Sequence, residues 1–117
     1  MPRNPKVSIL LNCYNGEKFL KSAIDSALEQ TFGDWELIFF NNCSTDSSKK
    51  IFFSYKDNRL KYFERKSKTD LVHARNEAIN HASSNWIAIL DSDDFWKKEK
   101  LEKQISALEK MQALDAK

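Results

Sequence analysis

Short apolar runs recur along the chain, and polar segments that carry turn residues separate them. The runs are rich in aliphatic, β-branched and aromatic side chains, which favours strands over residues 6–11, 35–40, 60–64 and 86–90. The first and last runs are almost wholly apolar, so we expect buried strands there. Residues 60–64 alternate apolar and polar side chains, as a strand exposed on one side does.

Helices are expected in the segments that follow each strand. Apolar side chains at three- and four-residue spacing predict a helix over residues 17–30, which Gly33 ends, and another over 98–114. Candidate capping residues before residue 47 favour a short helix over 47–55. Asp70 can cap a third helix. The buried face of that helix is expected to comprise Leu71, Ala74, Ala78, Ile79 and Ala82.

Strand and helix alternate four times, which predicts an α/β fold with a mainly parallel sheet between two helical layers, a Rossmann-like α/β/α arrangement. We expect a single domain over residues 1–117. Ligands of such sheets bind at the carboxyl ends of the strands, where the strand order reverses. The polar segments "NCYNG", "NNCSTD" and "DSDD" all follow strands, so we expect them to share one edge of the sheet.

Composition narrows the function. Basic and acidic residues number 19 and 17, a net charge of +2 that gives no reason to expect a nucleic acid partner. No apolar run approaches the roughly 20 residues of a membrane span, and we expect a cytoplasmic protein. Cys13 and Cys43 lie far apart without a histidine cluster, so we expect reduced thiols and no zinc site.

The segment "DSDD" places three carboxylates where a predicted buried strand ends. Such a cluster repels itself unless a cation or several donors neutralise it. In an extended segment, Asp91 and Asp93 would lie on one face and could both address one Mg²⁺ or Mn²⁺. The alternative is that Asp94, and Asp91 with it, caps the final helix.

Several segments in order carry a family resemblance: "VSILLNCYNGEKFL", "WELIFFNNCSTDSS", "ARNEAI" and "WIAILDSDDFW". From about Pro5 to Ile105 the chain resembles the nucleotide-sugar-binding half of the inverting family 2 glycosyltransferases, which have the GT-A fold. The resemblance implies a donor site for a nucleotide-diphosphate sugar, a UDP-sugar before others. It also implies a Mg²⁺ or Mn²⁺ cofactor.

The resemblance also implies roles for individual residues. Cys13, Tyr14 and Asn15 match the segment in which an aromatic ring packs near the donor base. The family's usual "DDGSTD" appears here as "NNCSTD", so Asn42 stands where an aspartate accepts from the base, and Ser44 follows it. The acidic motif and the "ARN" segment complete the implied site. They contribute Asp91, Ser92 and Asp93, with Asp91 and Asp93 as metal ligands, and Arg75 near the nucleotide.

The resemblance implies a transferase activity in which the sugar passes, with inversion, to a hydroxyl of a glycan or lipid-linked acceptor. It also implies a place in cell-surface polysaccharide synthesis, at the inner face of the membrane. The family's general base lies beyond the acidic motif, so no residue of this chain is assigned that role. We therefore expect a donor half without its acceptor half, which binds the nucleotide but does not transfer sugar alone. An apolar edge left uncovered would favour a homo-oligomer.

Other classes remain as alternatives. A phosphotransferase would need an aspartate after the first strand, where the chain has Asn12 and Asn15. A receiver-like signalling domain would need carboxylates after its first and third strands. The remaining alternative is a non-catalytic nucleotide-binding or interaction module that keeps the fold without activity, since Asn41 and Asn42 replace the usual carboxylates.

Overall fold

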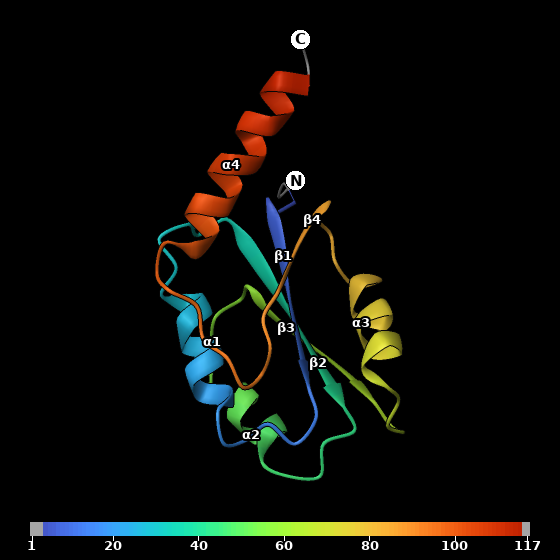
Figure 1. Cartoon of the computed structure of the whole chain (residues 1–117). Coiled ribbons are helices and arrows are strands. Elements are labelled where there is room, and N and C mark those ends of the chain that lie inside the picture. Colours follow the sequence, from blue (N-terminus) through green and yellow to red (C-terminus); the bar gives the residue numbers. More distant parts are fainter. Residues whose placement is uncertain (1–3, 116–117) are drawn as a thin grey trace.

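The computed structural model describes residues 4–115 and contains the predicted alternation of strands and helices (Figure 1). The elements are β1 (Val7–Cys13), α1 (Leu20–Leu28), β2 (Trp35–Asn42), α2 (Ser48–Phe53), β3 (Leu60–Arg65), α3 (Leu71–Ile79), β4 (Trp86–Ile89) and α4 (Lys100–Asp115). Each lies where the apolar pattern predicts it. The side chain of Asp70 accepts a hydrogen bond from the N–H of His73, which confirms it as the N-cap of α3.

The four strands form one parallel sheet in the order β3-β2-β1-β4. The chain adds β2 and β3 on one side of β1 and then returns to place β4 on the other side. The strand order therefore reverses between β1 and β4. Because parallel strands end at the same edge, the segments that follow β1, β2 and β4 meet there, as predicted.

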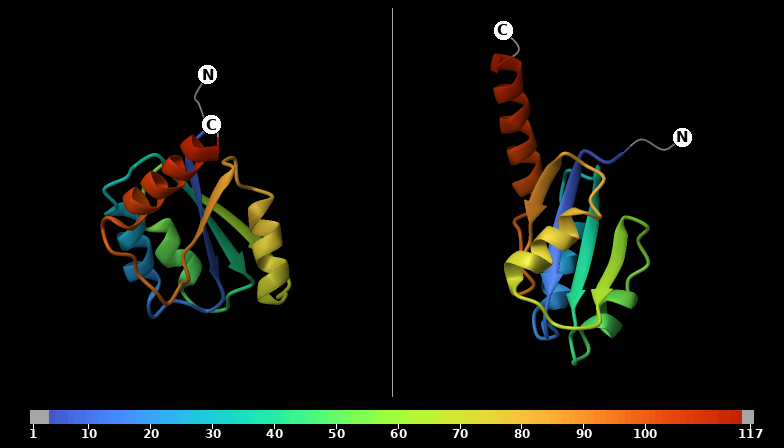
Figure 2. Two further views of the ribbon diagram at one scale, coloured as in Figure 1. Left: turned by 45° about the horizontal axis from the view of Figure 1, so that its top comes forward. Right: turned by 90° about the vertical axis from the view of Figure 1, so that its right-hand side faces the viewer.

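Helices cover both faces of the sheet, which confirms the three-layer α/β/α fold (Figures 1 and 2). The larger core lies between one face of the sheet and α1, α2 and the first turns of α4. It includes Ile9, Leu11, Leu20, Ile24, Leu37, Phe39, Phe52, Trp96 and Leu101. The smaller core lies under α3, where Ala74 and Ala78 pack on Leu10, Ile38 and Phe40.

The predicted buried face of α3 is wrong in part. Ala74 and Ala78 are fully buried, whereas Leu71 and Ile79 are 51% and 44% exposed. The helix contacts the sheet through its alanines, which allow a close approach and leave the larger side chains at the rim. Leu71 instead lines the cleft at the sheet edge.

The prediction of a buried fourth strand is also wrong. β4 is an edge strand, and Ile87 and Ile89 on it are 38% and 48% exposed. α4 buries apolar side chains near its start, where Leu101 and Ile105 are buried, whereas Met111 further along is exposed. Figure 1 shows the rest of α4 projecting beyond the sheet. Within residues 4–115, no helix is long and apolar enough to cross a membrane.

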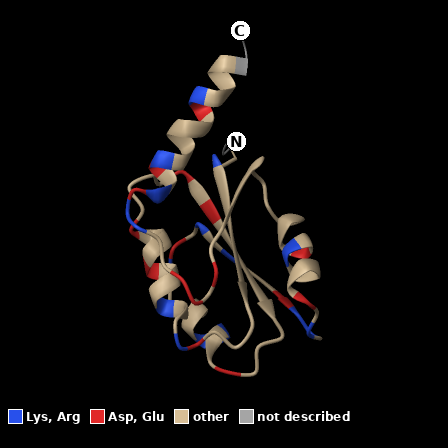
Figure 3. Cartoon of the chain, in the orientation of Figure 1, with Lys and Arg blue, Asp and Glu red and all other residues tan. Residues whose placement is uncertain are grey.

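Charged residues of both signs lie on the helices and loops, including α4 (Figure 3). In the sheet, β1 and β4 carry no charged residue, whereas β2 and β3 do. This distribution agrees with the mixed charge pattern of the sequence.

Candidate functional site

A cleft of about 810 Å³ opens at the carboxyl edge of the sheet, beside the reversal of strand order. The segments after β1 and β4, the end of β2 and the start of α3 contribute to its walls. Most predicted site residues line it: Cys13, Tyr14, Asn15, Asn42, Arg75, Asp91, Ser92 and Asp93. Ser44 is not among the lining residues. Chain segments that are far apart in sequence, up to 81 residues between Asn12 and Asp93, therefore form one polar cavity.

The acidic segment turns back on itself after β4. Leu90 donates its N–H to the carbonyl of Leu10, which sets Asp91 beside the end of β1. Asp94 N–H then donates to the carbonyl of Asp91 at 3.1 Å, the hydrogen bond of a β-turn. The expectation of an extended segment is therefore wrong. Asp91 and Asp93 nonetheless line the same cleft, because the turn rather than strand alternation directs them there.

Arg75 of α3 joins the acidic turn from across the cleft. Its guanidinium Nη2 lies 3.2 Å from Oδ1 of Asp91, in an ion pair that remains open to solvent on both sides. The Nε of the same guanidinium is buried and has no hydrogen-bond partner among residues 4–115. Arg75 thus contacts the acidic turn through Nη2, and its Nε–H remains available to donate a further hydrogen bond.

Hydrogen bonds tie the segment after β1 to the segment after β2. Asn15 N–H donates to Oγ of Ser44 at 2.9 Å, and Thr45 N–H donates to Oδ1 of Asn15 at 2.7 Å. Asp46 accepts from Glu17 N–H at 3.1 Å. Ser44 therefore positions the β1 segment rather than facing the cleft. These contacts tie the segment after β2 to the β1 segment that lines the cavity.

Burial and hydrogen bonds shift the pKa values of two side chains in this wall, Cys13 and Asp46. Burial raises the pKa of the Cys13 thiol above its ordinary value, and hydrogen bonds with Ser48 and Gly16 offset only part of that effect. Burial acts to raise the pKa of Asp46, but hydrogen bonds from the hydroxyl and N–H of Ser48 outweigh it and lower that pKa. The Cys13 thiol is consequently neutral at pH 7, and both thiols are free, as predicted.

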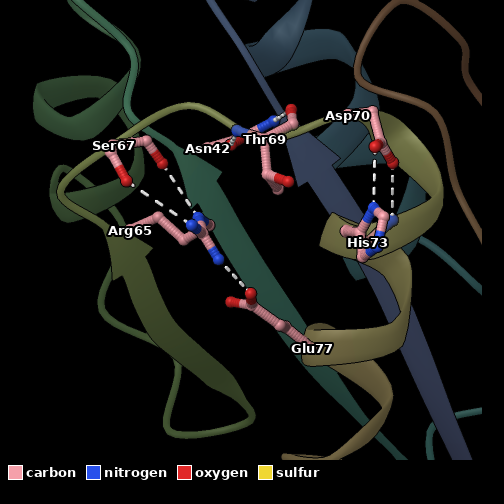
Figure 4. A network of polar contacts seen from close by, with 7 residues as sticks. All are labelled: Asn42, Arg65, Ser67, Thr69, Asp70, His73 and Glu77. Atoms are coloured by element: carbon pink, nitrogen blue, oxygen red, sulfur yellow. Dashed lines mark hydrogen bonds and ion pairs between the residues drawn. The ribbon is translucent and has the colours of Figure 1, made fainter.

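The β3–α3 loop (residues 66–70) forms the opposite wall and is held by side chains from β2 and β3 (Figure 4). Asn42 donates from Nδ2 to the carbonyl of Thr69 at 2.7 Å and accepts from Thr69 N–H at 3.0 Å. Arg65 pairs with Glu77 of α3 and donates from Nε to the carbonyl of Ser67 at 2.8 Å. Both the N–H and the carbonyl of the Asn42 amide are therefore hydrogen-bonded to the loop backbone.

Tyr14 and Lys68 meet across the mouth of the cleft. The Lys68 ammonium lies 3.9 Å from the centroid of the Tyr14 ring, within cation–π range. Tyr14 is 43% exposed, so one part of its ring remains accessible. The pair joins the β1 segment to the β3–α3 loop at the rim, next to a flat aromatic surface.

Sequence reasoning missed several lining residues. Asn12 and Gly16 flank the predicted "CYN", and Lys68, Thr69 and Asp70 come from the β3–α3 loop. A polar residue that ends an apolar strand was the available signal for Asn12. No local pattern distinguishes Lys68 or Thr69, because the loop reaches the cleft only after β3 and α3 have packed.

The charges that line the cleft are balanced: Lys18, Lys68 and Arg75 against Asp70, Asp91 and Asp93. Within residues 4–115, no three or more His, Cys, Asp and Glu side chains form a group able to hold a metal ion. Asp91 and Asp93 therefore offer two carboxylates at most. That donor set suits Mg²⁺ or Mn²⁺, which take only one or two carboxylates when a diphosphate and water complete the shell.

A parallel α/β sheet with a polar cleft at its reversal point is the framework of nucleotide-binding proteins. The sequence profile "Glycosyl transferase family 2" matches residues 8–116 of the chain. The chain belongs to this family.

Two curated relatives are also named as glycosyltransferases. The chain is 37% identical over 103 residues to TuaG of Bacillus subtilis (strain 168), a glycosyltransferase named for teichuronic acid biosynthesis, and the match covers 86% of the chain. It is 38% identical over 102 residues to WfgD of Escherichia coli, named UDP-Glc:alpha-D-GlcNAc-diphosphoundecaprenol beta-1,3-glucosyltransferase, with 87% of the chain covered. The matches span 41% and 40% of these two relatives.

Solved structures share the fold. The S. aureus TarS fragment 1–349 in complex with UDP superposes with a TM-score of 0.83 at 27% identity, over 90% of this chain and 32% of that one. The same fragment with UDP-GlcNAc gives 0.83 at 26% identity, over 90% of this chain and 31% of that one. The predicted fold class is thereby confirmed as that of GT-A-like neighbours.

Proposed function

We propose that this chain is the donor-binding part of an inverting glycosyltransferase that binds a UDP-sugar together with Mg²⁺ or Mn²⁺. The sugar passes to a hydroxyl of a glycan or lipid-linked acceptor. Family membership and the UDP and UDP-GlcNAc complexes of TarS support the donor class. WfgD, whose name specifies a diphosphoundecaprenol acceptor, supports the acceptor class.

One observation carries the proposal: Arg75, Asp91, Asp93 and Tyr14 line a single cleft at the reversal point of the sheet. A nucleotide diphosphate needs a flat surface for its base and compensation for its phosphate charge. The accessible ring of Tyr14 offers the first. Arg75, which has an unpaired buried Nε, offers the second, together with the cation that Asp91 and Asp93 would hold.

The proposed role of each residue follows from its position in the cleft. Tyr14 stands at the rim of the cleft, where the part of its ring that Lys68 leaves exposed packs against the base. Arg75 donates to the diphosphate and orients Asp91 through their ion pair. Asp91 and Asp93 would hold the cation, which would supply Lewis-acid neutralisation of the leaving diphosphate when bound. No residue of the described chain is assigned as the base that takes the acceptor's proton.

Calorimetric titration of UDP with and without Mn²⁺ tests the proposal. The wild type should bind UDP in the presence of Mn²⁺, and Asp93→Asn should lose that binding because one of two carboxylate ligands is gone. Asp94→Asn is the matched control, since it removes the same charge one residue away and Asp94 does not line the cleft. Equal UDP binding by wild type and Asp93→Asn would refute the metal assignment. Absence of binding by the wild type would refute the donor site.

A further inference from the structure

Asn12 has an unusual environment at the floor of the cleft. Both Nδ2 and Oδ1 of its side chain are buried, and neither has a hydrogen-bond partner among residues 4–115. An amide group buried without partners is destabilising, because each unpaired end has lost its hydrogen bonds to water and gained none in return. Within the described residues, Asn12 is the one side chain that leaves a buried donor and a buried acceptor unpaired together.

The position of Asn12 directs it toward the cleft. Side chains alternate along β1, so Asn12 lies on the same face as Leu10, which packs under α3. Asn12 and Ala74 of α3 both line the cleft. Asn12 pairs in register with Phe40, and Asn42 is two residues further along β2. Two asparagines on adjacent strands therefore face the cavity from the same side of the sheet.

The two asparagines differ in what their amides already do. Asn42 makes two hydrogen bonds to the backbone of Thr69, at 2.7 and 3.0 Å, and would have to break them to pair with a ligand. Asn12 has no hydrogen bond to break. When the Asn12 side chain rotates into the cleft that it lines, its amide N–H and its carbonyl, both unpaired before, can each form a hydrogen bond with a ligand.

We propose that Asn12, rather than Asn42, pairs with the base of the bound nucleotide. Its Nδ2 donates to a ring carbonyl and its Oδ1 accepts from the adjacent ring N–H, the complement of the imide edge of uracil. The unpaired state of the amide in the free protein makes Asn12 selective for a ligand that carries such an edge. This assignment rests on the proposed function and adds the residue that reads the base.

Isothermal titration of UDP and of inorganic pyrophosphate, both with Mn²⁺, tests the assignment on wild type and Asn12→Leu. Leucine fills a similar volume and has no polar atoms. Asn12→Leu should weaken UDP binding about ten- to hundredfold, the effect of two lost hydrogen bonds. Its affinity for pyrophosphate should equal that of the wild type, because Asn12 contacts only the base. Asn58→Ala, in an exposed loop, is the control and should bind both ligands as the wild type does.

The melting temperature of each free variant separates a ligand contact from a structural role. Asn12→Leu should melt at or above the wild-type temperature, since it removes two unpaired buried groups. Unchanged UDP affinity would overturn the proposal. A lower melting temperature with equal losses of UDP and pyrophosphate affinity would also overturn it, as a purely structural effect. If the wild type bound neither pyrophosphate nor UDP, that result would instead refute the proposed function.

Discussion

Gly16 and Ser92 are in contact across the point where the strand order reverses, and only a glycine leaves room for this contact. A Cβ placed on Gly16 would lie 3.0 Å from Oγ and 3.2 Å from Cβ of Ser92, and 3.0 Å from Sγ of Cys13. The backbone of Gly16 does not have a positive φ, so space rather than conformation requires the glycine. The contact seats the acidic turn against the segment after β1.

Gly16→Ala should therefore lower the free energy of unfolding by about 1–3 kcal/mol, the usual cost of overpacking. It should also weaken Mn²⁺-dependent UDP binding, because the acidic turn must shift. Urea unfolding and titration measure the two effects. Gly33→Ala is the matched control: its new Cβ would meet only Arg59 Nη1, at 3.7 Å, which is ordinary contact. Equal stability of both variants would contradict the tight contact.

Replacement of Asn42 by alanine should loosen the β3–α3 loop. The N–H and carbonyl of Thr69 both lose their partner, so the free energy of unfolding should fall by about 1–3 kcal/mol. The Thr69 amide should exchange with solvent faster than in the wild type, which hydrogen exchange followed by NMR detects. Asn58→Ala serves as control. Thr69 exchange that is unchanged in Asn42→Ala would show that the loop is held by other contacts.

Cys43 adopts a left-handed backbone conformation, with φ of 61°. For a residue with a Cβ this conformation costs about 1–2 kcal/mol, and glycine avoids the cost. Cys43→Gly should raise the free energy of unfolding by about 0.5–1 kcal/mol, after the larger chain entropy of unfolded glycine is counted. Cys43→Ala, which removes the thiol but keeps the Cβ, should give no such gain in the same denaturant titration. A gain shared by both variants would trace the effect to the thiol.

Glu36 should make stability depend on pH. The carboxylate is buried in β2 and accepts from Ser8 Oγ at 2.5 Å, from Ser83 N–H at 2.6 Å and from Lys61 Nζ at 3.0 Å. Burial acts to raise the pKa of Glu36, but these hydrogen bonds outweigh it and lower that pKa below the ordinary 4.5. The unfolded chain therefore binds the proton more tightly, and the stabilisation is complete above pH 4.5 and lost as pH falls through the folded pKa.

Glu36→Gln should accordingly be less stable than the wild type at pH 7, by about 1–3 kcal/mol. The difference should shrink as the pH is lowered from 5 toward 3, because the wild type then loses the charge as well. Urea midpoints at a series of pH values measure this. Glu102→Gln, an exposed carboxylate of α4, should show little difference at any pH. A gap between wild type and Glu36→Gln that stays constant with pH would contradict the shifted pKa.

Local patterns were sufficient for the fold and for part of the site. Apolar runs and helical spacing located all the elements, and turn-rich polar segments after the strands located Tyr14, Asp91 and Asp93 in the cleft. These features depend on residues close together in sequence. The exposure of Leu71 and of Ile89 was beyond such patterns, because it depends on which neighbour each element packs against.

The sequence by itself thus determined the order of the elements, the parallel sheet and the edge at which the polar segments gather, since periodicity and turn residues act locally. Only the tertiary structure decided which polar side chains are free to bind. Asn12 and Asn42 are the same residue type at adjacent strand ends, yet one amide is unpaired and the other is held by Thr69, 27 residues away. Hydrogen bonds between distant residues form only after the layers pack, so no local pattern carries them.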